Sequence, residues 1–149
     1  MSTPESLGFA GSVLAVDDCP AMRELMRASL ECLGYSVQAV GSGWAALDAV
    51  HETLFDILVL DVEMPGLDGM AVGRALRSSE RTATAVIAMH SSVAESEVRA
   101  GFPDYDAFVS KGAGVRFLGE QVDRLFRSRR MTNGAEISFA RLGDTPTSD

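Results

Sequence analysis

The chain contains few of the residues and segments that mark several classes of protein. Only two of its 149 residues are cysteines, Cys19 and Cys32, so it lacks the disulfide framework of a small secreted domain. No apolar run approaches the ~20 residues that a membrane span needs. Residues 1–7 show neither the basic nor the apolar region of a signal peptide. We therefore expect a cytoplasmic protein without a membrane span.

Positive charge is also scarce. The chain has 13 Lys and Arg residues against 21 Asp and Glu residues, which gives a net charge of -8 at pH 7. All of the basic residues are arginines except Lys111. An acidic chain is a poor non-specific binder of nucleic acid or anionic lipid. The length, with 46% hydrophobic and 23% charged residues, is typical of one globular domain.

Short apolar segments alternate with helical patterns along the chain. Continuous apolar segments are typical of strands buried on both faces, whereas residues 35–40 alternate and so suit a strand at the edge of a sheet. Strands are expected at residues 13–16, 35–40, 57–60, 85–89 and 107–109. Helices are expected at residues 20–33 and 44–52, after Asp68, from Ser92 to Gly101, and from Val115 to near Arg129.

Five strands that alternate with five helices predict an α/β fold, a doubly wound parallel sheet with helices on both faces. The expected domain spans residues 11–130, after an N-terminal extension of residues 1–10. Residues 131–149 show little periodicity and are expected to form a flexible tail. That segment is too short for an output domain, so no DNA-binding domain is expected in this chain.

Charged residues follow the predicted strands. Asp17 and Asp18 follow the first strand, Asp61 ends the third, and Lys111 follows the fifth. Sites in open α/β sheets form at the carboxyl ends of the strands. Two carboxylates 4 Å apart repel by ~4 kcal/mol at an effective dielectric constant near 20. Mg²⁺ would relieve this repulsion and keep coordination positions open for a phosphoryl group, which Lys111 could also contact.

The segment from Val59 to Gly69, VLDVEMPGLDG, follows the Asp17-Asp18 pair and precedes Lys111. In this order and spacing, these motifs resemble the receiver domain of two-component response regulators, of the chemotaxis single-domain type. The resemblance covers residues 11–129. It implies a flavodoxin-like fold with the strand order 2-1-3-4-5.

The resemblance also implies roles for particular residues. Asp61 would accept a phosphoryl group from a phosphohistidine on a histidine kinase or a histidine phosphotransfer protein. Asp18, Asp61 and the backbone carbonyl of Glu63 would ligate Mg²⁺, and Asp17 would act through a metal-bound water. Lys111 would bind a phosphoryl oxygen.

The resemblance assigns the output to a switch. Phe108 occupies the position of the family's switch aromatic. Phosphorylation would change the face formed by the fourth helix, fifth strand and fifth helix, and so control a downstream protein partner in a phosphorelay. The protein is then expected to be a phosphoacceptor and not an enzyme acting on other substrates.

Three residues depart from the family pattern. His90 stands where the family has Thr or Ser at the end of the fourth strand, and Ser91 follows it, so either could contact the phosphoryl group; we favour Ser91. Gly112 replaces the proline after Lys111, so the family's cis peptide bond is not expected. Glu63 lies two residues after Asp61, and we hypothesise that its charge alters the lifetime of the acyl phosphate.

Two other functions remain open. Arg124, Arg127, Arg129 and Arg130 either form a solvated helix end or bind an anionic ligand such as a cyclic dinucleotide. The second interpretation would make the chain a binding module that is not phosphorylated. A metal-dependent phosphatase would also use an aspartate nucleophile, with Glu63 at the spacing of a general acid. The sequence shows no further substrate pocket or lid for that reaction.

Overall fold

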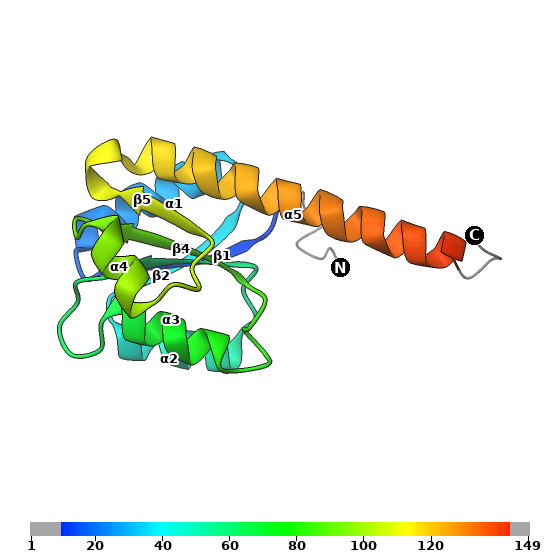
Figure 1. The fold of residues 1–149 in the computed structure, drawn as a ribbon. Helices are drawn as coiled ribbons and strands as arrows, with labels where there is room; N and C mark the ends of the chain where they lie inside the picture. Colours follow the sequence, from blue (N-terminus) through cyan, green and yellow to red (C-terminus); the bar gives the residue numbers. More distant parts are fainter. Residues whose placement is uncertain (1–9, 144–149) are drawn as a thin grey trace.

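The computed structural model describes the backbone of residues 10–143 and the side chains of residues 10–132. Strands and helices alternate along the chain (Figure 1). The elements are β1 (Ser12–Val16), α1 (Pro20–Cys32), β2 (Ser36–Val40), α2 (Gly43–Glu52), β3 (Ile57–Asp61), α3 (Gly69–Arg77), β4 (Val86–Ser91), α4 (Glu95–Gly101), β5 (Ala107–Ser110), a 3₁₀ turn (Lys111–Ala113) and α5 (Val115–Gly143). Within residues 10–143, every helix is too short or too polar to cross a membrane.

The five strands form one parallel sheet in the order β2-β1-β3-β4-β5. The predicted α/β class and the order implied by the resemblance are therefore confirmed. β2 lies at an edge of the sheet, where the alternation of its sequence placed it. Because all strands are parallel, their carboxyl ends meet at one edge of the sheet.

Successive side chains of each strand point to opposite faces of the sheet, and both faces are covered by helices. Val13, Ala15 and Val59 face a core completed by α1 and α5, whereas Leu14, Leu58 and Leu60 face a core completed by α2, α3 and α4. Figure 1 shows α1 and α5 on one side of the sheet and α2 and α3 on the other. β3 is buried along its whole length, so the groups at its end are held on a rigid frame.

Proline, glycine and a capping aspartate mark the ends of two helices. Pro20 occupies the first turn of α1, and Gly34 follows that helix with a φ of 98°, a conformation that favours glycine. The Asp68 side chain accepts a hydrogen bond from the backbone N–H of Ala71 and caps α3. The cap holds α3 directly after the loop that follows Asp61.

Two predicted helix boundaries are wrong. α4 begins at Glu95 and not at Ser92, because the Ser91 hydroxyl accepts the backbone N–H of Val93 and holds that segment in a turn. α5 continues to Gly143 and not to near Arg129, and the predicted domain boundary at residue 130 lies inside it. No proline interrupts the chain between Val115 and Gly143. The expected extension at residues 1–9 and the last part of the expected tail, residues 144–149, lie outside the described residues.

Candidate functional site

Four ionisable residues from neighbouring strand ends share one face of the sheet. Asp17 follows β1, Asp61 ends β3, His90 lies near the end of β4, and Lys111 follows β5. Asp17, Asp61 and His90 continue the alternation that places Ala15, Val59 and Ala88 on the side of α1 and α5. The structure therefore brings together residues that are far apart in the sequence.

One ammonium group joins the two buried carboxylates. Nζ of Lys111 lies 3.0 Å from Oδ2 of Asp17 and 3.1 Å from Oδ1 of Asp61. Asp17 is fully buried and Asp61 is 2% exposed. The backbone N–H of Cys19 also donates to Oδ1 of Asp17, at 2.9 Å. Two buried negative charges thus face one positive charge at the ends of the strands.

Burial is the largest influence on the pKa of Asp61. Burial, together with repulsion from Asp17, raises the pKa of the Asp61 carboxyl to about 6, although Lys111 and the backbone N–H of Glu63 act to lower it. Burial also acts to lower the pKa of Lys111, but its contacts with Asp17 and Asp61 outweigh this effect and raise it. The site without a cation therefore carries unrelieved negative charge.

The donor set fits a small divalent cation. One carboxylate oxygen from each of Asp17, Asp18 and Asp61 lies within 4.8 Å of the others, and Asp18 is exposed to solvent. Carboxylates in a partly open arrangement are the ligands that hard cations such as Mg²⁺ take in proteins, with water at the remaining positions. The backbone carbonyl of Glu63 stays a predicted ligand, and the Glu63 side chain is exposed to solvent.

His90 and Ser91 occupy different faces. His90 pairs with Asp61 in the β3–β4 register and is 1% exposed. Burial, and then the charge of Lys111, lower the pKa of the imidazole to about 4, while Asp17 acts in the opposite direction. Ser91 alternates to the side of α2, α3 and α4, and its hydroxyl accepts the backbone N–H of Val93 at 2.8 Å.

Phe108 lies in β5 and packs against the core on the side of α2, α3 and α4. Its ring centroid is 6.4 Å from that of Tyr105, whose hydroxyl donates to the Glu95 carboxylate at 2.5 Å. This contact ties the start of α4 to the segment before β5. Tyr105 lies three residues before Phe108 in the sequence, but no sequence motif predicts its role.

The C-terminal arginines do not meet at one point. Arg127 pairs with Asp123 at 2.8 Å, and Arg130 donates to the backbone carbonyl of Ala10 and lies over the ring of Phe126. Arg124 is exposed. The contacts of Arg127 and Arg130 are made within the chain, with separate partners, and do not form a common anion site.

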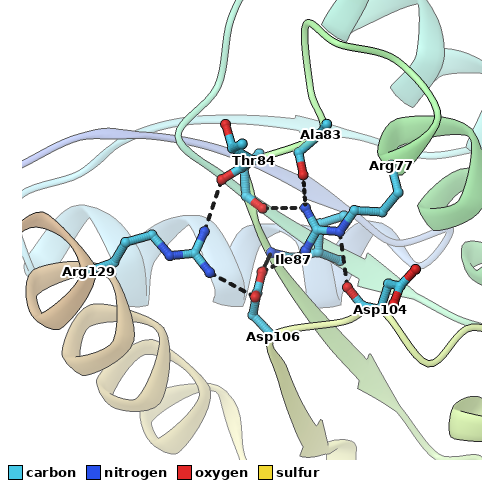
Figure 2. A network of polar contacts seen from close by, with 8 residues as sticks. Arg77, Ala83, Thr84, Ile87, Asp104, Asp106 and Arg129 are labelled. Carbon is cyan, nitrogen blue, oxygen red and sulfur yellow. Dashed lines mark hydrogen bonds and ion pairs between the residues drawn. The ribbon is translucent and has the colours of Figure 1, made fainter. Parts of the chain in front are cut away.

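Arg129, the fourth arginine of that group, belongs to a polar network at the amino ends of β4 and β5 (Figure 2). Its guanidinium donates to the Thr84 carbonyl and to Oδ1 of Asp106. Oδ2 of Asp106 accepts from Arg77 and from the backbone N–H of Ile87. The network joins α3, the sheet and α5 at the edge of the sheet opposite Asp61. No sequence motif predicts it.

The order of motifs and the geometry of the strand ends agree with a known family. The family model described as the response regulator receiver domain matches residues 13–123. The chain belongs to this family. Asp17, Asp61 and Lys111, whose roles the resemblance implies, lie at the ends of β1, β3 and β5.

Particular relatives of this receiver domain are longer proteins. Response regulator MprA of Mycobacterium leprae is 38% identical over 136 residues, which cover 87% of this chain and 58% of that protein. The gliding motility regulatory protein of Myxococcus xanthus is 36% identical over 116 residues, 76% of this chain and 15% of that protein. The chain thus spans only part of the length of these relatives.

A solved structure supports the fold. Response regulator TrrA of Thermotoga maritima, in complex with Mg²⁺ and a beryllium fluoride, has a TM-score of 0.69 and 29% sequence identity. The match covers 76% of this chain and 97% of that protein. The receiver fold of this chain is thereby shown by its sequence family and by its structure.

Proposed function

We propose that this receiver domain accepts a phosphoryl group on Asp61 from a phosphohistidine of a histidine kinase or a histidine phosphotransfer protein. The observation that supports this proposal most strongly is the buried Asp61 carboxylate, which shares the Lys111 ammonium with Asp17. Phosphoryl transfer needs positioning and charge neutralisation more than acid–base chemistry, and this arrangement supplies both.

In the transfer step, one oxygen of the Asp61 carboxylate forms a bond to phosphorus as the bond between phosphorus and the donor's imidazole nitrogen breaks. The electron pair of the broken bond stays on that nitrogen, so no oxidant or reductant takes part. The Lys111 ammonium lies within hydrogen-bond distance of the Asp61 carboxylate, where it can hold a phosphoryl oxygen.

Mg²⁺ would be held by Asp18, Asp61 and the Glu63 carbonyl, with Asp17 acting through a bound water. When bound, the cation neutralises charge on the phosphoryl oxygens. Asp17 and Asp61 are both buried, so their mutual repulsion is strongest without a cation. Relief of this repulsion favours the binding of a divalent cation.

The face formed by α4, β5 and α5 is the surface that signals to the partner. Phosphorylation shifts the populations of its conformations, because the protein's contacts with the phosphoryl group differ from those with the free carboxylate. Phe108 and the Tyr105–Glu95 contact lie on this face. We propose that the chain controls a protein partner through this face. A cytoplasmic location stays a prediction.

Phosphorylation is tested with Mg²⁺ and acetyl phosphate as the phosphodonor, followed by intact mass in a buffer that preserves acyl phosphates. Wild type is expected to gain the mass of one phosphoryl group, and Asp61→Asn is expected to gain none. Chelation of Mg²⁺ should abolish the adduct. An equal adduct on both proteins would contradict the assignment of Asp61.

The effect of Glu63 on the acyl phosphate is a separate hypothesis. Glu63 is exposed and follows Asp61 by two residues, and its backbone N–H contacts the Asp61 carboxyl. Glu63→Ala is expected to change the half-life of the phosphorylated protein in a dephosphorylation time course. An unchanged half-life would contradict the hypothesis and leave the phosphorylation of Asp61 intact.

A further inference from the structure

The side chain of Arg23 contacts the acidic loop, residues 17–19 between β1 and α1, without contributing a ligand to the carboxylate cluster. Arg23 lies in the first turn of α1 and is partly buried. Its Nη1 donates to the backbone carbonyl of Asp17 at 2.7 Å. Its backbone N–H donates to the carbonyl of Cys19 at 3.0 Å. Arg23 is therefore bonded to the first and the last residue of the loop.

The contact from Arg23 continues the hydrogen bonding of the backbone beyond the end of the sheet. The register of β1 with β2 ends at Val16 and Val40, and the N–H of Asp17 still donates to the Val40 carbonyl at 3.2 Å. The carbonyl of Asp17 lies past that pair and is bonded by the Arg23 guanidinium. A hydrogen bond from a charged donor is stronger than one from a neutral donor, so this carbonyl is firmly held.

The carbonyl that Arg23 holds belongs to the peptide group between Asp17 and Asp18. A peptide group is planar, so a fixed carbonyl also fixes the directions of the two Cα atoms that the group joins. The carboxylate of Asp17 has further contacts, with the backbone N–H of Cys19 and with Lys111. Asp18 is exposed to solvent, so the position of its carboxylate depends mainly on the backbone that carries it.

Gly41, which follows β2, leaves the space that the guanidinium occupies. A Cβ atom on Gly41 would lie 2.7 Å from Nη1 of Arg23, closer than non-bonded atoms normally approach. The end of a long side chain moves more easily than the backbone. An alanine at position 41 would therefore displace the guanidinium from the Asp17 carbonyl without changing Arg23 itself.

We propose that Arg23 is a positioning residue for the magnesium site, because it holds the Asp17–Asp18 peptide in the orientation in which these carboxylates and that of Asp61 share one cation. This inference deepens the proposed function and rests on the magnesium site described there. Loss of a residue that orients metal ligands typically weakens metal affinity about 10–100-fold. The charge of Arg23 acts in the opposite direction, because removal of one cation favours the binding of another nearby. The sign of the effect therefore separates positioning from charge.

The same helix provides a matched control. Arg27, four residues after Arg23, donates through Nη1 to the backbone carbonyl of Val37 at 3.0 Å. Both arginines thus join α1 to a backbone carbonyl, but Val37 lies near the start of β2, away from the acidic loop. Arg27→Ala removes the same charge and the same type of hydrogen bond as Arg23→Ala, without affecting the peptide between Asp17 and Asp18.

Mg²⁺ binding would be measured on the full chain, without a phosphodonor, from the NMR signals of the backbone amides of residues 17–19 and 61–63. Arg23→Ala is expected to raise the Kd for Mg²⁺ about tenfold, and Arg23→Lys should give an intermediate value. Gly41→Ala should also raise the Kd. Arg27→Ala should leave the Kd unchanged, although it lowers the midpoint of urea unfolding about as much as Arg23→Ala.

Phosphorylation by acetyl phosphate provides a second measurement. For Arg23→Ala, the Mg²⁺ concentration that gives half of the maximal rate should rise about tenfold, and saturating Mg²⁺ should restore most of the wild-type rate. A Kd in Arg23→Ala equal to or below that of wild type, or an equal rise in Arg27→Ala, would overturn the positioning role and leave the magnesium site standing. A wild-type protein that does not bind Mg²⁺ would overturn the magnesium site and this inference together.

Discussion

The buried ion pairs of Asp17, Lys111 and Asp61 show what a sequence can and cannot indicate about single residues. The position of each at a strand end, and their grouping at one edge, followed from the order of the apolar segments. The sequence could not show that one ammonium would bridge two buried carboxylates at 3.0 and 3.1 Å. Such geometry depends on the register of β1, β3 and β5, which no local pattern determines.

The unrelieved charge at this site predicts a gain in stability from a change that abolishes function. Asp61→Asn removes one of two carboxylates that are buried beside each other. We expect the free energy of unfolding in EDTA at pH 7 to rise by roughly 1–3 kcal/mol, because a buried like-charge repulsion disappears. Urea unfolding of both proteins measures this difference.

The same experiment with Mg²⁺ provides the control. Mg²⁺ should stabilise wild type in proportion to its binding, since it binds the folded state, and should stabilise Asp61→Asn much less. A variant that is less stable than wild type in EDTA would show that the repulsion between Asp17 and Asp61 is not the dominant electrostatic effect.

The placement of His90 could not be read from the sequence for a related reason. His90 and Ser91 are neighbours in a strand, and a difference of one residue in register decides which of them shares a face with Asp61. From the sequence alone, Ser91 is the favoured phosphoryl contact. The backbone register instead pairs His90 with Asp61, and only a structure supplies that register.

At the scale of the elements, polar contacts link α5 to the segments before β2 and β5. Tyr35, which precedes β2, donates its hydroxyl to Asp123 at 2.7 Å, and its ring packs edge-on against Phe126. Arg129, further along α5, reaches Asp106 before β5. The apolar periodicity of residues 115–125 predicted the inner face of this helix. Its continuation to Gly143 was missed, because the periodicity ends before the helix does.

Tyr35→Phe is expected to destabilise the protein without changing its phosphorylation. Tyr35 is 2% exposed, and its hydroxyl is bonded to a carboxylate. Loss of this hydrogen bond should lower the free energy of unfolding by about 1–3 kcal/mol at pH 7. Urea unfolding measures the loss, with phosphorylation by acetyl phosphate as the control. An unchanged stability would show that the contact contributes nothing to the attachment of α5.

The same tyrosine predicts a pH dependence. Burial, and then the hydrogen bond to Asp123, raise the pKa of Tyr35 above its ordinary value near 10. Above pH 10 the unfolded chain loses this proton while the folded chain retains it, so the stability of wild type should fall as pH rises. Tyr35→Phe lacks this contribution, so the difference between the two proteins should shrink between pH 9 and pH 11. A constant difference would contradict the assignment.

The network around Asp106 in Figure 2 predicts an effect on stability that is independent of the phosphorylation site. Asp106 accepts from Arg77, Arg129 and the backbone of Ile87. Asp106→Asn removes the charge that pairs with both guanidinium groups, so we expect the free energy of unfolding to fall by about 2 kcal/mol. Asp104→Asn removes the same charge from an exposed neighbour and should change stability by less than ~0.5 kcal/mol.

The network lies at the amino ends of β4 and β5, whereas Asp61 lies at the carboxyl end of β3. Acetyl phosphate should therefore phosphorylate Asp106→Asn and wild type at rates within about a factor of two at a temperature where both are folded. A large loss of rate in the folded variant would show that the two ends of the sheet are coupled.

For the molecule as a whole, the topology explains why the fold and the location of the site could be predicted from the sequence. Alternating strands and helices predict a parallel sheet, whose carboxyl strand ends lie at one edge. The location of the site therefore follows from the sequence alone. The sequence does not determine the features that depend on strand register and on long-range contacts. These include the choice between His90 and Ser91, the Tyr105–Glu95 contact and the network around Asp106.

The central claim is that Asp61 alone carries the phosphoryl group. After phosphorylation with acetyl phosphate and Mg²⁺, reduction with borohydride would convert the acyl phosphate to an alcohol, and peptide mass spectrometry would locate the reduced residue. We predict that aspartate is converted to homoserine at position 61, and that Asp17 and Asp18 stay unmodified. Homoserine at position 17 or 18 with an unmodified Asp61, or a phosphoryl group that resists borohydride because it is on another type of residue, would contradict the account.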